Sequence, residues 1–132
     1  MNQLQAKVTK IQGTQGLKIV TFHCANTSLK MMSLDLQENI HDKTVVQLTC
    51  KPTSIAIAKN FSGELSYANQ LNAVILSLEL GELLCSIQLQ FTTFTLESII
   101  TADSASRLRL AVGDEVTALI KASDLSIAKV IS

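Results

Sequence analysis

The feature that most constrains this chain is an internal repeat of about 60 residues. The run Asn-Gln-Leu-x-Ala begins at Asn2 and begins again at Asn69, and "VQLTCKPTSIAIAK" in the first half matches "VTALIKASDLSIAK" in the second. The offset between matched residues drifts from 67 to 70, as expected when loops gain residues and strands do not. A repeat on this scale indicates duplication of one small structural unit. We therefore predict a first unit at 1–60, a linker at 61–66 and a second unit at 67–132.

Hydrophobic and polar residues alternate within each unit, which is typical of strands with one buried face. In "CSIQLQFT", for example, Cys85, Ile87 and Leu89 fall on one face and the intervening polar residues on the other. The pattern predicts ten strands, near 3–12, 17–24, 28–35, 44–51 and 54–59, and then near 67–79, 82–92, 94–101, 115–121 and 124–131. One short helix or turn fits between the third and fourth strands of each unit, and Asp103 or Ser104 would cap the second. The predicted fold is all-β, with two tandem OB-type five-stranded Greek-key barrels.

Composition and charge exclude several classes of function. The chain is 47% hydrophobic, and its 11 basic residues equal its 11 acidic residues in number. It therefore lacks the basic field with which proteins gather nucleic acid, and with four Phe and one Tyr it has few aromatic residues to stack on single strands. Its three cysteines are odd in number and lack a CxxC spacing, which favours reduced core thiols. No signal pattern or membrane-length apolar run is present, so we expect a cytoplasmic protein without membrane contact.

No arrangement of residues indicates catalysis. The sequence contains no Ser/His/Asp pattern, no paired acidic motif and no glycine-rich phosphate loop. His23 and Cys24 are adjacent, so on a strand they would point to opposite faces and could not chelate one metal ion. We therefore expect a protein that is not an enzyme and that has no direct metal ligands.

Three motifs taken in order resemble the molbindin, or TOBE-type, family of molybdate-binding domains. They are "SYANQLNA" from Ser66, "SIIT" ending at Thr101, and "VGDEVTALIKAS" ending at Ser123. The resemblance is strong in 66–129 and looser in 2–59. It implies a homotrimer that binds the tetrahedral oxyanions molybdate or tungstate between units of neighbouring subunits, for storage, buffering or sensing, with no covalent cofactor.

The resemblance also implies which residues bind the oxyanion. Aligning "KMMSLDL" with "SIITADS" places Ser33 on Thr101. The candidates in the second unit are Ser66, Asn69, Thr101, Lys121, Ala122 and Ser123, and those in the first unit are Asn2, Ser33, Lys51 and Thr53. A dianion with four acceptor oxygens needs many N–H and O–H donors and a little positive charge, which hydroxyls and lysine supply.

The sequence departs from the family pattern in ways that leave alternatives open. Ala68 stands at the family's arginine position, the first unit begins at Asn2 without the preceding serine and arginine, and Pro52 removes a backbone donor. The two Lys-x-(Ser/Thr) turns could be solvated turns, and the serine and asparagine of the second unit could bond to the barrel's own backbone. Lys59 and Lys129 are interpreted as surface charges. The rival function is an oligomerising effector or interaction module of a molybdate-responsive regulator or transporter, with a weakened or lost anion site.

Overall fold

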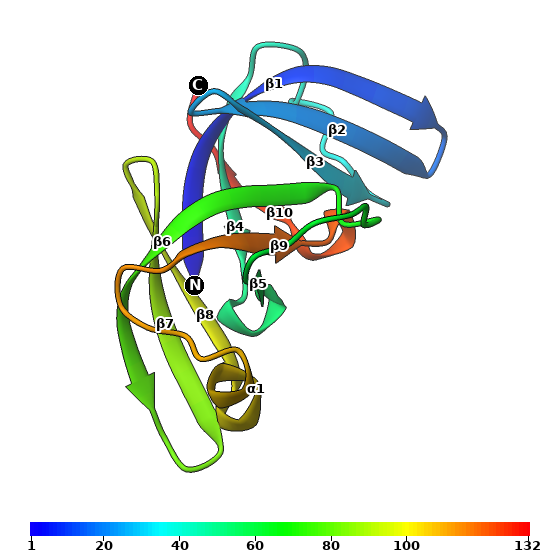
Figure 1. Cartoon of the computed structure of the whole chain (residues 1–132). Coiled ribbons are helices and arrows are strands. Elements are labelled where there is room, and N and C mark those ends of the chain that lie inside the picture. The colour runs from blue at the N-terminus through cyan, green and yellow to red at the C-terminus, as the bar shows by residue number, and fades with distance from the viewer.

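Two five-stranded antiparallel sheets make up this protein, whose computed structural model describes residues 1–132 (Figure 1). The strands are β1 (Asn2–Thr14), β2 (Leu17–Cys24), β3 (Thr27–Ser33), β4 (Val45–Cys50), β5 (Ala56–Ala58), β6 (Asn69–Leu80), β7 (Leu84–Phe91), β8 (Phe94–Thr101), β9 (Glu115–Ile120) and β10 (Ser126–Val130). One α-helix, α1 (Ala102–Arg107), and two 3₁₀ turns, η1 (Pro52–Ser54) and η2 (Ala122–Asp124), complete the structure. The prediction of an all-β, two-barrel fold is confirmed.

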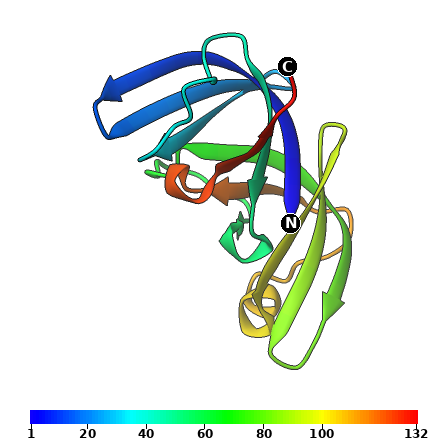
Figure 2. The same ribbon diagram turned by 180° about the vertical axis from the view of Figure 1, so that it is seen from behind.

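The last strand of each half pairs with the sheet of the other half. The strand orders are β10-β4-β1-β2-β3 and β5-β9-β6-β7-β8. Ile127 of β10 lies opposite Leu48 of β4, and Ile57 of β5 lies opposite Ala118 of β9. Figure 2 shows the red C-terminal strand beside the blue and cyan strands of the first half. Neither sheet is therefore built from one continuous half of the chain.

The period-two pattern places one face of each strand in the core. In β1, Leu4, Ala6 and Val8 are buried and the residues between them are exposed, and β6 repeats this burial pattern. Both strands carry a bulge directly after this buried run, between Val8 and Lys10 and at the equivalent point of β6. A bulge increases local twist, which lets the long first strand of each half curl around the core. The buried hydrophobic residues of both sheets form one cluster.

The connections between the third and fourth strands differ between the halves. In the second half α1 begins after Thr101, whose side chain accepts a hydrogen bond from the backbone N–H of Ser104. The N-cap is therefore Thr101, and the prediction of Asp103 or Ser104 was wrong by two or three residues because the strand runs directly into the helix. In the first half the connection at 34–44 contains turns and no helix.

The cysteines Cys24, Cys50 and Cys85 are buried, as predicted, and burial raises the pKa of each thiol. None of the helices is both long and apolar enough to cross a membrane.

Candidate functional site

Two buried asparagines tie the sheets together. The side chain of Asn69 is fully buried, and its Oδ1 accepts from the backbone N–H of Lys30 at 2.7 Å while its Nδ2 donates to the carbonyl of Lys30 at 2.9 Å. Asn2 makes the same pair of bonds to the backbone of Glu97, at 2.7 and 2.9 Å. Both amides are thus held by the third strand of the opposite sheet. The alternative in which these asparagines bond to the protein's own backbone describes the structure, and the Asn69 side chain is buried away from solvent.

These two contacts also correct the alignment of the halves. Because Asn2 and Asn69 are equivalent, their partners Glu97 and Lys30 are equivalent as well. Three residues further along the strands, Ser33 is then equivalent to Ile100, and Leu34 is equivalent to Thr101. The strand pairing agrees with this alignment, because Ser33 lies opposite Lys18 and Ile100 lies opposite Cys85. Lys18 and Cys85 are themselves equivalent, since each precedes a matched core position by four residues. The predicted match of Ser33 with Thr101 was wrong by one residue, which places the two side chains on opposite faces.

An open cavity of about 540 Å³ lies where β8 ends, and we call it the Thr101 cavity. It brings together three of the predicted site residues, Thr101, Lys121 and Thr53, which come from both halves of the chain. The full lining is Thr53, Ser54, Ile55, Ala56, Tyr67, Leu84, Ile99, Ile100, Thr101, Ser104, Lys121 and Asp124. The lining comes from both halves because the last strand of each half pairs with the sheet of the other half, an arrangement that we call strand exchange. It places η1 and β5 of the first half against β8 of the second.

A buried hydrogen bond holds the exchanged segment in place. The hydroxyl of Ser98, which is fully buried in β8, donates to the backbone carbonyl of Ile55 at 2.6 Å. Ile55 directly follows η1 and is itself buried. The hydroxyls of Thr53 and Ser54 are thereby fixed close to the end of β8.

Hydroxyl groups dominate the polar lining near the start of α1. Thr101 Oγ1 donates to Ser104 Oγ at 2.9 Å and accepts from the Ser104 backbone N–H at 3.1 Å. Arg107 Nη2 donates to the same Ser104 Oγ at 3.2 Å. Because Ser104 Oγ accepts both of these bonds, its own proton is free to be donated to another group. Ser104 and Arg107 were not predicted as site residues, and their only sequence signal is the Thr-x-x-Ser spacing of a helix start.

The other predicted residues lie elsewhere. Lys51 and Ser123 line a separate cavity of about 280 Å³ between the two 3₁₀ turns, together with Ser54 and Asp124. Ser33 and Ser123 line a cavity of about 510 Å³ between the end of β3 and the η2–β10 segment, where most of the lining is hydrophobic. Ser66 is exposed and makes no side-chain hydrogen bond, and Ala122 is half-buried in η2. Proximity in the structure thus groups Thr101 with Lys121 and Thr53, and does not group Ser66 with them.

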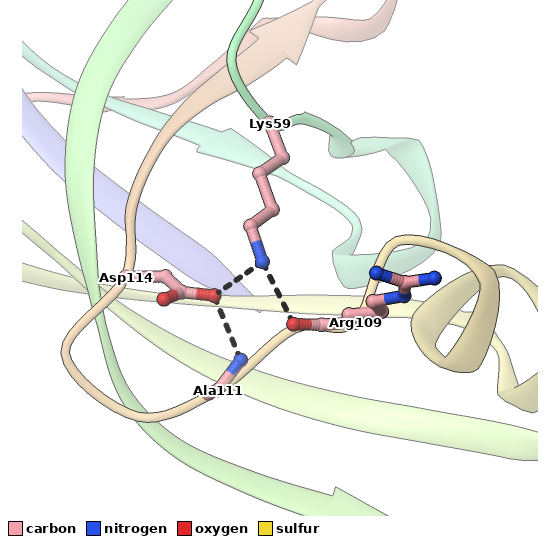
Figure 3. Close-up of polar contacts among 4 residues, drawn as sticks. All are labelled: Lys59, Arg109, Ala111 and Asp114. Carbon is pink, nitrogen blue, oxygen red and sulfur yellow. Dashed lines mark hydrogen bonds and ion pairs between the residues drawn. The ribbon is translucent and has the colours of Figure 1, made fainter.

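Lys59 is more than the free surface charge that was predicted. Its Nζ lies 3.1 Å from Asp114 Oδ2 and donates to the backbone carbonyl of Arg109 at 2.7 Å (Figure 3). The same Asp114 oxygen accepts from the Ala111 backbone N–H at 2.9 Å. This N–H and, second, the Lys59 ammonium lower the pKa of Asp114. Since Lys59 follows β5, the contact fastens the exchanged strand to the turn before β9.

The equivalent turn in the first half has no such ion pair. Thr44 Oγ1 accepts from the His41 backbone N–H at 3.1 Å, as Asp114 does from Ala111. A threonine carries no charge, however, and Lys129 makes no ion pair. The two exchanged strands are therefore anchored by different means.

Comparison with known proteins found a family match in the second half of the chain and solved structures with a similar fold. Residues 65–127 match the family model of the TOBE domain. Among solved structures, the cytoplasmic molybdate-binding protein ModG, in a crystal form with molybdate bound, has a TM-score of 0.89 at 20% identity, covering 96% of this chain and 94% of that chain. The molybdate-binding protein from Sporomusa ovata is 33% identical over 51% of this chain and 100% of that chain, with a TM-score of 0.49. No curated protein matches the chain.

The likeness to ModG over nearly the whole chain shows a protein of two OB-type units. Residues 65–127, in the second half of the chain, belong to the TOBE-domain family. The family resemblance of the sequence is thereby confirmed.

Proposed function

We propose that this protein binds a tetrahedral oxyanion, molybdate or tungstate, in the cytoplasm, and that it stores, buffers or senses the anion without catalysing a reaction. The observation that carries the proposal is the Thr101 cavity, where hydroxyl-bearing residues of both halves line the same space as Lys121. The TOBE-domain match and the shared fold with ModG support it.

The chemistry of the cavity suits such an anion. Molybdate and tungstate present four acceptor oxygens and no donor, so their recognition depends on directed N–H and O–H groups. Thr53, Ser54 and Ser104 offer hydroxyls, and Lys121 offers a compact cation. A hydrogen bond to a charged group contributes roughly 1.5–3 kcal/mol. Loss of the lysine is therefore expected to weaken binding by one order of magnitude or more.

Isothermal titration with molybdate, tungstate, sulfate and phosphate tests the proposal. We expect heat of binding with the two metal oxyanions and little with the others. Lys121→Ala should weaken molybdate binding about tenfold or more and leave the thermal midpoint unchanged, because the exposed Lys121 side chain contributes little to stability. Lys10→Ala, which removes an exposed lysine from β1, is the matched control. If neither metal oxyanion binds, or if Lys121→Ala binds as the parent does, the assignment is wrong.

We also propose that the protein is a homotrimer, in keeping with the family resemblance. Several large hydrophobic side chains of the second half are exposed in the single chain, among them Leu76, Leu80, Leu83 and Leu84. Leu83 is 78% exposed, and exposed hydrophobic side chains that form a contiguous patch mark an interaction surface. Sedimentation equilibrium should give three times the mass of the chain, and a monomer at micromolar concentration would contradict this assembly.

A second function is favoured by one observation. The position before Asn69 is the uncharged, exposed Ala68, and the lysine and aspartate residues that line the Thr101 cavity are one of each. An interaction module whose anion site has decayed would have this character. A stable oligomer that binds none of the four anions would support that function over oxyanion binding.

A further inference from the structure

The Thr101 cavity has a charge balance that does not by itself favour a dianion. Lys121 is the only basic residue of its lining, and Asp124 is the only acidic one. Both side chains are exposed to solvent, so at neutral pH their charges cancel in the lining. A dianion is attracted to a site with net positive potential and repelled by a nearby carboxylate. A second cation close to the lining would change this balance.

Arg107 is placed to supply that charge. It lies in the last turn of α1, and its guanidinium donates to Ser104 Oγ at 3.2 Å. Ser104 is a lining residue of the cavity, and its Oγ also accepts from Thr101 at 2.9 Å. The guanidinium is therefore joined to the cavity wall through one hydroxyl. Arginine stays charged at every pH of interest and, unlike lysine, presents several donors in a fixed plane.

We propose that Arg107 is the second cation of the oxyanion site and that it acts partly through Ser104. The inference rests on the proposed function and names a charge-bearing residue for the same cavity. By donating to Ser104 Oγ, Arg107 leaves the Ser104 proton available for an anion oxygen and makes that hydroxyl a better donor. Its positive charge also adds to that of Lys121 and opposes that of Asp124.

The test uses conservative variants of the full chain and titration with molybdate. Arg107→Gln should weaken binding about tenfold or more, as expected for loss of one charge-assisted interaction. Arg107→Lys, which keeps the charge, should recover most of the affinity. Arg109→Gln is the matched control, because Arg109 is the only other arginine of the chain and its side chain makes no hydrogen bond to Ser104. The thermal midpoints of the three variants should agree with the parent's.

Two further measurements separate a charge effect from a structural one. The ratio of the parent's affinity to that of Arg107→Gln should shrink as salt is raised, since screening weakens an exposed charge. Ser104→Ala should weaken binding as well, and the double variant should lose less than the sum of the single losses, because the two residues act as a unit.

Several outcomes would overturn the proposal. If Arg107→Gln binds as the parent does while Lys121→Ala binds more weakly, the role of Arg107 is wrong and the oxyanion function stands. Equal weakening by Arg107→Gln and Arg109→Gln would show a general field rather than a site residue. A loss of affinity that is accompanied by a lower thermal midpoint and is not rescued by lysine would show a structural role. If the parent binds neither metal oxyanion, both proposals fail.

Discussion

Replacing Asn69 with alanine is the sharpest test of how the two halves are held together. The substitution removes both hydrogen bonds to the backbone of Lys30, at 2.7 and 2.9 Å, from a residue that is fully buried. Each bond has a net value of roughly 1 kcal/mol, and a backbone group left unpaired in the interior costs about 1–3 kcal/mol. Lys30 is exposed and its strand β3 is the last of its sheet, so water can reach the freed groups in part. We therefore expect Asn69→Ala to lower the free energy of unfolding by ~2–3 kcal/mol, near the low end of what these contributions allow.

Thermal and urea unfolding measure this loss. For a chain of this size, 1 kcal/mol corresponds to roughly 4 °C in the midpoint, so Asn69→Ala should unfold about 8–12 °C lower than the parent. Asn72→Ala is the control, since Asn72 lies on the same strand, is exposed and makes no side-chain hydrogen bond. Asn2→Ala should repeat the effect through Glu97. Exposed substitutions usually change the free energy of unfolding by no more than about 0.5 kcal/mol. If the stability of Asn69→Ala is within about 0.5 kcal/mol of that of Asn72→Ala, the asparagine contacts do not join the halves.

Three further substitutions test the anchoring of β5, the effect of a guanidinium next to Asn69, and the position equivalent to Thr101 in the first half. Asp114→Asn removes a carboxylate whose pKa is lowered in the folded state. This lowered pKa stabilises the fold at pH values above the ordinary pKa of 3.8, and the stabilisation is lost as the pH falls through the folded-state pKa. The parent should therefore exceed the variant in urea midpoint at pH 7 but not at the acid end of its stable range. If the parent still has the higher urea midpoint at the acid end of the range, this account of Asp114 is wrong. Ala68→Arg adds a guanidinium at an exposed position next to Asn69 and should lower the molybdate Kd, and an unchanged or higher Kd would argue against a site near Ala68. Leu34→Thr places a hydroxyl at the position equivalent to Thr101 and should raise the molybdate stoichiometry per chain, whereas an unchanged stoichiometry would show that one hydroxyl does not make a second site.

Most of the strands could be predicted from the sequence because the alternation of buried and exposed residues is regular and occurs twice. The predicted strand at 94–101 coincides with β8, and that at 17–24 coincides with β2. The exchange of the last strands could not be predicted. "SIAIAK" and "LSIAK" are nearly the same sequence, so alternation gives each strand an equally good fit to either sheet. The partner is decided by the connections in three dimensions, which the pattern does not encode.

The candidate site was only partly accessible from the sequence for a similar reason. Thr101, Lys121 and Thr53 stand in motifs and were predicted, whereas Ser104 lines the cavity, and Arg107 bonds to Ser104, through the geometry of one helical turn. Matching residue types favoured placing a serine of the first half on Thr101. A strand's register is set instead by which side chains reach the core, and one residue of slip reverses the face.

The strand exchange makes the Thr101 cavity a property of the whole chain. Thr53 and Ser54 reach it only because η1 leads into β5, which pairs with β9 of the second half. The buried bond from Ser98 to the Ile55 carbonyl then fixes the turn. A change in the first half therefore acts directly on a cavity most of whose lining residues belong to the second half. A chain cut between β5 and β6 would leave each sheet without a covalent connection to its last strand. Fragments of that kind should rebuild the cavity only when mixed, because neither contains all of its hydroxyls.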